Sequence, residues 1–158
     1  MSKKHHYTTK LQWTGNKGTG TSDYKSYQRD HKILVNGKQE IACSSDPSFR
    51  GDPTRYNPEE FLVASLSSCH MLWYLHLCAV NGVVVTGYTD QAEGTMVENP
   101  DGGGQFSSVT LYPNVTVESE AMIKKAMELH EEANKRCFIS SSCNFPVHHQ
   151  PEIFVGGK

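Results

Sequence analysis

Several common signatures are missing from this chain. It has no Cys-x-x-Cys pair, so a zinc ribbon or a thioredoxin-type site is disfavoured. Basic residues form no run and the formal net charge is -2, so nucleic acid is not an expected partner. The pairs His5-His6 and His148-His149 have no companion ligands nearby, so we expect no metal and no bound cofactor.

The chain also lacks an apolar segment at its start. Residues 1–10 are polar, so we expect no secretory signal. Five cysteines, an odd number, fit a reducing compartment and a cytoplasmic protein. Only 37% of residues are hydrophobic, which is low for a globular domain and favours a core completed by a partner subunit. With 158 residues we expect one domain, 1–158.

Turn signals divide the first third of the chain into strands. Residues 7–13 are expected to form a strand, residues 21–35 a second and residues 38–43 a third. Asn36-Gly37 is a strong two-residue hairpin signal between the last two. A meander of three antiparallel strands follows.

A helix is expected over about 58–80. Asn57 can cap it, Pro58 suits its first position, and Glu60 stands where a capping-box acid would. The segment is apolar nearly all round and long enough to approach a membrane span. Serines and histidines interrupt it, so we expect a buried central helix and no membrane contact.

The remaining segments complete an α+β pattern. Two long β-rich runs, 83–97 and 106–117, are expected to form a hairpin through the glycine-rich loop at 100–104. A second helix is expected from Ser119 to about 136, and a final strand near 151–155. The predicted order is β-β-β-α-β-β-α-β, with antiparallel sheets and two helices.

Cys69 lies in the middle of the apolar helix. A lone cysteine there is most often a small core residue. Polar atoms on a buried helix need partners, so we expect the polar residues around Cys69 to line a cavity. These residues are Ser65, Ser67, Ser68 and His70.

A second thiol follows the second helix. Lys135 and Arg136 precede Cys137, and nearby positive charge favours a thiolate. Cys143 follows six residues later. Either cysteine can resolve an oxidised Cys69, and spacing alone does not choose between them.

Two motifs carry a family resemblance. The segment 57–70, with Asn-Pro-Glu-Glu, an apolar pair, small residues and then Cys69, resembles the central-helix signature of OsmC-family proteins. The segment 137–140, Cys-Phe-Ile-Ser, is similar to that family's second-cysteine motif. The order of elements is similar too, so the resemblance spans nearly the whole chain.

This resemblance implies an OsmC-like fold, an intertwined homodimer and a peroxidase of the organic-hydroperoxide-resistance type. Cys69 would be the peroxidatic thiol and Cys137 the resolving one. Glu59, with an arginine, would polarise the thiolate. The substrate would be an organic hydroperoxide, with hydrogen peroxide a second candidate. An external dithiol, lipoyl-based in the hydroperoxide branch, would be the reductant.

The chain departs from the family pattern at two points. Lys17 stands where the family often has its arginine, and a lysine lacks the fork that clamps a carboxylate. Arg29, Arg50 or Arg55 can supply the guanidinium instead, and we favour Arg55 because it is close to Glu59 in sequence. Phe138 replaces the usual proline after the second cysteine. The alternative is a non-catalytic ligand-binding or stress protein on the same scaffold.

Overall fold

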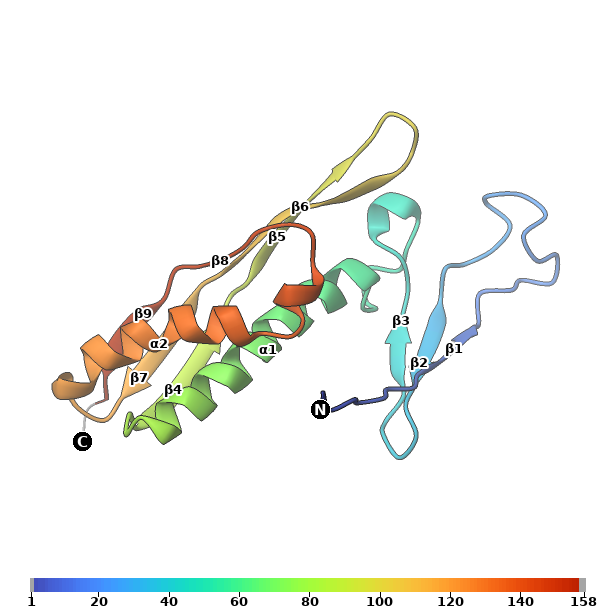
Figure 1. Cartoon of the computed structure of the whole chain (residues 1–158). Coiled ribbons are helices and arrows are strands. Elements are labelled where there is room, and N and C mark those ends of the chain that lie inside the picture. The colour runs from blue at the N-terminus through green and yellow to red at the C-terminus, as the bar shows by residue number, and fades with distance from the viewer. Residues whose placement is uncertain (1, 157–158) are drawn as a thin grey trace. The chain divides into compact units, whose positions relative to one another are not determined.

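The computed structural model describes residues 2–156, which form two units (Figure 1). The first unit is Met1–Phe61 and the second is Leu62–Lys158. The mixture of sheets with two long helices is the α+β class that the sequence predicted. The single domain expected for 1–158 stays a prediction.

The strands of the first unit form one antiparallel sheet. Its strands are β1 (Lys10–Trp13), β2 (His31–Leu34) and β3 (Ile41–Cys43), in the order β1-β2-β3. The predicted meander is therefore confirmed, and Gly37 takes the positive φ of 75° that its hairpin requires. The strands are shorter than predicted.

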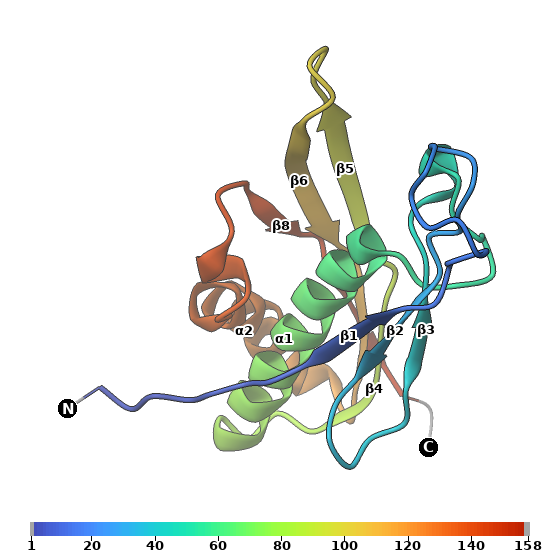
Figure 2. The same cartoon turned by 90° about the vertical axis from the view of Figure 1, so that its right-hand side faces the viewer.

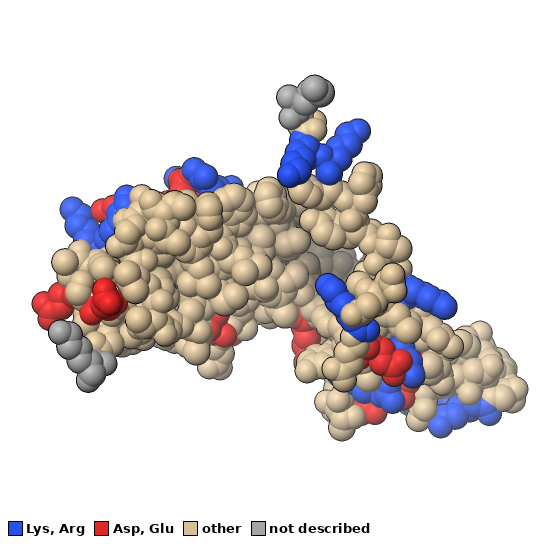
Figure 3. Space-filling view, turned by 90° about the horizontal axis from the view of Figure 1, so that it is seen from below, with Lys and Arg blue, Asp and Glu red and all other residues tan. Residues whose placement is uncertain are grey.

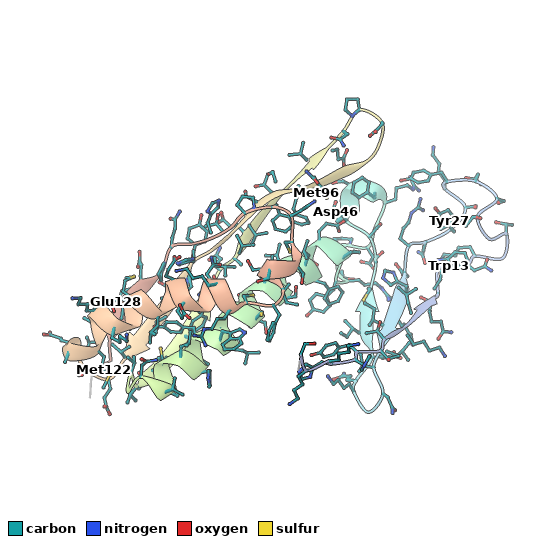
Figure 4. All side chains as sticks on the ribbon, viewed as in Figure 1. Trp13, Tyr27, Asp46, Met96, Met122 and Glu128 are labelled. Carbon is teal, nitrogen blue, oxygen red and sulfur yellow. The ribbon has the colours of Figure 1, made fainter. Side chains whose placement is uncertain are left out.

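Much of the predicted second strand is instead a structured loop before β2. The Trp13 indole N–H donates to the Gln28 carbonyl at 2.8 Å, and the Trp13 ring packs edge-on against Tyr27 (Figure 4). These contacts hold the loop in place without the backbone hydrogen bonds of a β-sheet. A short 3₁₀ helix, η1 (Pro47–Phe49), follows β3.

The long helix α1 (Pro58–Val80) has the predicted bounds and cap. The Asn57 backbone N–H donates to Glu60 Oε2 at 3.0 Å, and the Glu60 N–H donates to Asn57 Oδ1 at 2.8 Å. This reciprocal pair is a capping box, which satisfies two donors that the first helical turn leaves free. Gly82, with a φ of 72°, ends the helix.

The two predicted β-rich runs each contain two strands. They are β4 (Val85–Asp90) and β5 (Glu93–Glu98), then β6 (Gly104–Leu111) and β7 (Pro113–Val117). Each run crosses from one sheet to the other near its middle, because β4 pairs with β7 whereas β5 pairs with β6. Figure 2 shows β5 and β6 as a projecting hairpin.

Two further strands extend these sheets in parallel. β8 (Val147–His149) joins β6, and β9 (Glu152–Val155) joins β7. The final strand was predicted, whereas β8 was not. In the chain, helix α2 (Ile123–Arg136) follows β7 and precedes β8. The 3₁₀ helix η2 (Glu120–Met122) comes directly before it and η3 (Ser140–Ser142) shortly after it.

Only one side of α1 is covered within the second unit. Tyr74, Leu77 and Cys78 are buried in a core shared with β7 and α2. On the other side Leu72 is 61% exposed and Val80 is 64% exposed. The surface of this unit seen in Figure 3 is largely uncharged. By length and composition α1 could cross a membrane, and only 28% of its apolar 18-residue window is buried, so the burial expected for it is incomplete in the single chain.

Candidate functional site

The second unit brings two thiols together. Cys69 lies midway along α1 and is half-buried, and Cys137 ends α2 and is 1% exposed. The two thiols are close enough for Cys69 to contribute to the raised pKa of Cys137. Spacing left Cys137 and Cys143 open as partners for Cys69, whereas the family resemblance favoured Cys137, and it is Cys137 whose pKa is affected by Cys69.

The backbone around Cys137 presents its sulfur to this site. Helix α2 stops because Cys137 takes an extended conformation, with φ -65° and ψ 112°. The chain then turns into η3, and the Ser140 backbone N–H donates to Cys137 Sγ at 3.3 Å. Burial, followed by the contact with Cys69, raises the pKa of the Cys137 thiol to about 11.

The positive charge expected to favour a thiolate at Cys137 is directed elsewhere. Lys135 pairs with Glu131 at 3.4 Å, and Arg136 pairs with Glu132 at 2.6 Å. Both are i,i+4 pairs along the surface of α2. The prediction that these residues lower the Cys137 pKa is wrong, because desolvation outweighs charges that are already paired.

The other three cysteines occupy separate environments. Cys143 donates its S–H to the Ile139 carbonyl at 3.3 Å, and burial raises the pKa of its thiol. Cys78 is 1% exposed in the core, and Cys43 is buried in the first unit. Residues 2–156 contain no disulfide among these five free thiols.

The polar residues around Cys69 bond to the protein around them. Ser65 donates to the Leu62 carbonyl at 2.8 Å, and Ser67 bonds to the Asp90 carboxylate on β4. Asp90 also accepts from the Tyr112 backbone N–H at 2.7 Å. Ser67 therefore links α1 to β4, and the cavity predicted around Cys69 stays a prediction.

An apolar surface adjoins the thiol pair. The Trp73 ring is one helical turn beyond Cys69 and meets the Phe138 ring edge-on, with centroids 5.6 Å apart. Phe138 follows Cys137 and is 70% exposed. A pocket of about 290 Å³ is lined by Leu72, Trp73 and His76. Because Leu72 and Trp73 give the pocket a mainly apolar lining, it suits an apolar rather than an ionic ligand.

Glu59 and Arg55 belong to the first unit. One carboxylate oxygen of Glu59, Oε2, is buried without a hydrogen-bond partner among residues 2–156. Arg55 makes ion pairs with Asp30 at 3.4 Å and with Asp52 at 3.5 Å. No ion pair within the described chain joins Arg55 to Glu59, and the role predicted for both in tuning Cys69 stays a prediction.

The other candidate cations are in the first unit too. Lys17 is exposed. The Arg29 guanidinium lies over Tyr24 and Tyr27, at 4.4 and 4.1 Å from the ring centroids, and donates to both of their carbonyls. These contacts hold Arg29 against its own neighbours. Arg50 has a left-handed backbone conformation, with a φ of 66°.

A buried histidine pair was not anticipated. His70 Nε2 and His130 Nδ1 are 3.0 Å apart, and His149 lies beside them. The sequence analysis named His70 only among the polar residues around Cys69, and His149 only in a pair without companion ligands. A histidine on the inner side of each helix was the available signal. No group of three or more ligating side chains within 2–156 is arranged to hold a metal ion.

Comparisons with known proteins agree with the motifs. The family model described as OsmC-like protein matches residues 51–152. An OsmC-like protein of unknown function from Vibrio cholerae has 28% identity and a TM-score of 0.84, covering 94% of this chain and all of the other. Among curated protein sequences none matches.

More distant structures share the fold. An organic hydroperoxide resistance protein from Legionella pneumophila has 18% identity and a TM-score of 0.67, covering 96% of this chain and all of its own. OhrB of Bacillus subtilis, an organic hydroperoxide resistance protein, has 20% identity and a TM-score of 0.61, covering 93% of this chain and 98% of its own. The family match covers well over half of the sequence and the fold agrees, so this chain belongs to the OsmC-like protein family.

Proposed function

We propose that this protein is a thiol-dependent peroxidase that reduces organic hydroperoxides in defence against oxidative stress. The observation that carries the proposal is the pairing of a half-buried Cys69 with a buried Cys137. Structural neighbours named for organic hydroperoxide resistance support the substrate class. The apolar pocket beside Trp73 supports an organic rather than a purely ionic substrate.

In the proposed reaction the Cys69 thiolate attacks the distal oxygen of ROOH. The O–O bond breaks, Cys69 becomes a sulfenic acid, and the released alkoxide takes a proton to leave as the alcohol ROH. Cys137 then attacks the Cys69 sulfur, forming a disulfide and releasing water. An external dithiol, with a lipoyl group as one candidate, returns both thiols and is itself oxidised.

Glu59 is the proposed positioning group for this thiolate. Its buried, unpartnered Oε2 supports the idea, because an isolated buried carboxylate oxygen gains most from a cation. We propose Arg55 as that cation. Arg55 already forms ion pairs with Asp30 and Asp52, so its guanidinium would have to be shared between these two carboxylates and that of Glu59.

We further propose a cytoplasmic homodimer. The exposed apolar side of α1, with Leu72 and Val80, supports burial against a second copy. Such a partner would also explain how a chain with 37% hydrophobic residues completes its core.

The direct test is consumption of cumene hydroperoxide with dithiothreitol or dihydrolipoamide as reductant. We expect Cys69→Ser to abolish turnover, whereas Cys143→Ser should retain it. Disulfide mapping after one equivalent of peroxide should find Cys69 joined to Cys137. Undiminished consumption by Cys69→Ser would exclude the mechanism. Full retention of both thiols under excess peroxide would favour the ligand-binding or stress-protein alternative.

A further inference from the structure

The histidine pair joins the two helices that carry the thiols. His70 on α1 and His130 on α2 are 1% and 0% exposed, and their Nε2 and Nδ1 atoms are 3.0 Å apart. The ring planes differ by only 6°, with centroids 5.3 Å apart. With so short an N–N distance, this separation means that the rings lie edge to edge, joined by an N–H···N bond rather than stacked face to face.

Neighbouring rings fix this pair in place. Tyr74, one turn beyond His70, stacks on His130 with centroids 3.8 Å apart. His149 on β8 packs against His70 at 5.6 Å, and its Nε2 is 3.6 Å from the Glu131 carboxylate. The bond is therefore held from three elements, and neither ring can turn without disturbing the core.

The bond requires that only one of the two facing nitrogens, His70 Nε2 or His130 Nδ1, carries a hydrogen. Each neutral imidazole has one N–H, so one ring donates and the other accepts. The outer nitrogens, His70 Nδ1 and His130 Nε2, are buried and have no partner within the described chain. The shared bond is thus the one hydrogen bond that keeps either ring from being an unpaired polar group in the core.

The position of the bond relates it to the thiols. His70 directly follows Cys69, and His130 precedes Cys137 by two helical turns, about 10 Å of rise. A contact that fixes His70 against His130 therefore constrains the register of α1 against α2, two turns before Cys137.

We propose that His70 and His130 are positioning residues, which hold Cys69 opposite Cys137 and so favour the disulfide between them. The biological use of this role rests on the proposed peroxidase function, but the role itself does not require peroxide. In a glutathione buffer the two thiols reduce one glutathione disulfide to two glutathione molecules, and the two electrons lost leave a Cys69–Cys137 disulfide.

The test is the equilibrium constant of that exchange at pH 7, measured on the full chain by thiol trapping. We expect His130→Phe to lower it about fivefold to tenfold, because one buried hydrogen bond is worth about 1 kcal/mol net. His130→Gln, which can still hydrogen-bond, should recover most of the loss. His148→Phe, at the exposed neighbour of His149, is the control and should match the wild type.

His70→Leu breaks the same bond from the other helix and serves if His130→Phe does not fold. A merely structural role would lower the free energy of unfolding without moving the exchange equilibrium, so urea unfolding is measured beside it. A wild-type equilibrium constant in a folded His130→Phe or His70→Leu protein would overturn the proposal. Absence of peroxide turnover in the wild type, together with the expected shift of the glutathione equilibrium in the variants, would instead count against the peroxidase function alone.

Discussion

Cys69 is near enough to Cys137 to raise the pKa of its thiol, although 68 positions separate them in the chain. One sulfur is half-buried and the other is buried against the backbone of η3. A reagent from solvent therefore meets Cys69 first. This difference in access supports the assignment of Cys69 as the attacking thiol and Cys137 as the resolving one.

The first prediction concerns how disulfide closure depends on pH. Because burial raises the pKa of Cys137 to about 11, its thiol is neutral near pH 7 and its thiolate fraction grows about tenfold per pH unit. The closure rate, starting from Cys69 sulfenic acid, should rise in the same way from pH 6 to 9. Stopped-flow tryptophan fluorescence can follow it. Cys143→Ser should have the same profile, and a plateau near pH 7.5 would contradict the prediction.

The second prediction concerns stability in acid. Burial lowers the pKa of His70 to about 4 and that of His130 to about 3, below the ordinary value of 6.5. Between the folded-state pKa values and 6.5, the unfolded chain binds more protons than the folded chain. The two histidines therefore make their full contribution to the free energy of unfolding above pH 6.5, and this contribution falls as the pH drops toward 4. The loss should be on the order of 5 kcal/mol for the two histidines together. It is measured by urea unfolding at several pH values.

The control for this experiment is His76→Gln, at an exposed position on the same helix. It should keep the wild-type slope between pH 6.5 and 4, whereas His70→Gln/His130→Gln should flatten it. An equal slope in the double variant would mean that other groups cause the acid sensitivity.

The third prediction concerns the capping box of α1. Asn57→Ala removes the oxygen that accepts from the Glu60 N–H, and caps of this kind contribute about 1 kcal/mol. For a chain of this size the Tm should fall by about 2–4 °C. Asn57→Ser, which retains a capping oxygen, should recover most of the difference in differential scanning calorimetry. Equal Tm values for the Ala and Ser variants would show that the cap contributes little.

The fourth prediction concerns the exposed apolar side of α1. If a second copy covers it, the protein should have twice the 17.6 kDa mass of one chain in light scattering. Leu72→Glu with Val80→Glu should shift the protein toward the monomer, because each places a charge in an apolar interface. Lys38→Glu, at an exposed turn of the first unit, is the charged control. A wild-type monomer would remove the homodimer proposal.

Local signals alone determined much of the fold. The Asn57–Glu60 cap, the Gly82 stop and the Asn36-Gly37 hairpin depend on residues only a few positions apart, so their physics is readable from the sequence. The strand switch near the middle of each β-rich run was not readable. It depends on which partner strand lies alongside, and that is decided between distant segments.

The candidate site divides in the same way. Spacing alone left Cys137 and Cys143 open as partners of Cys69, because they differ by only six positions, and the family resemblance of segment 137–140 favoured Cys137. Tertiary structure chose Cys137 and reversed the effect expected of Lys135 and Arg136, since burial and ion pairing are properties of the folded surface. It alone joined His70 to His130, because a hydrogen bond across 60 positions leaves no local pattern.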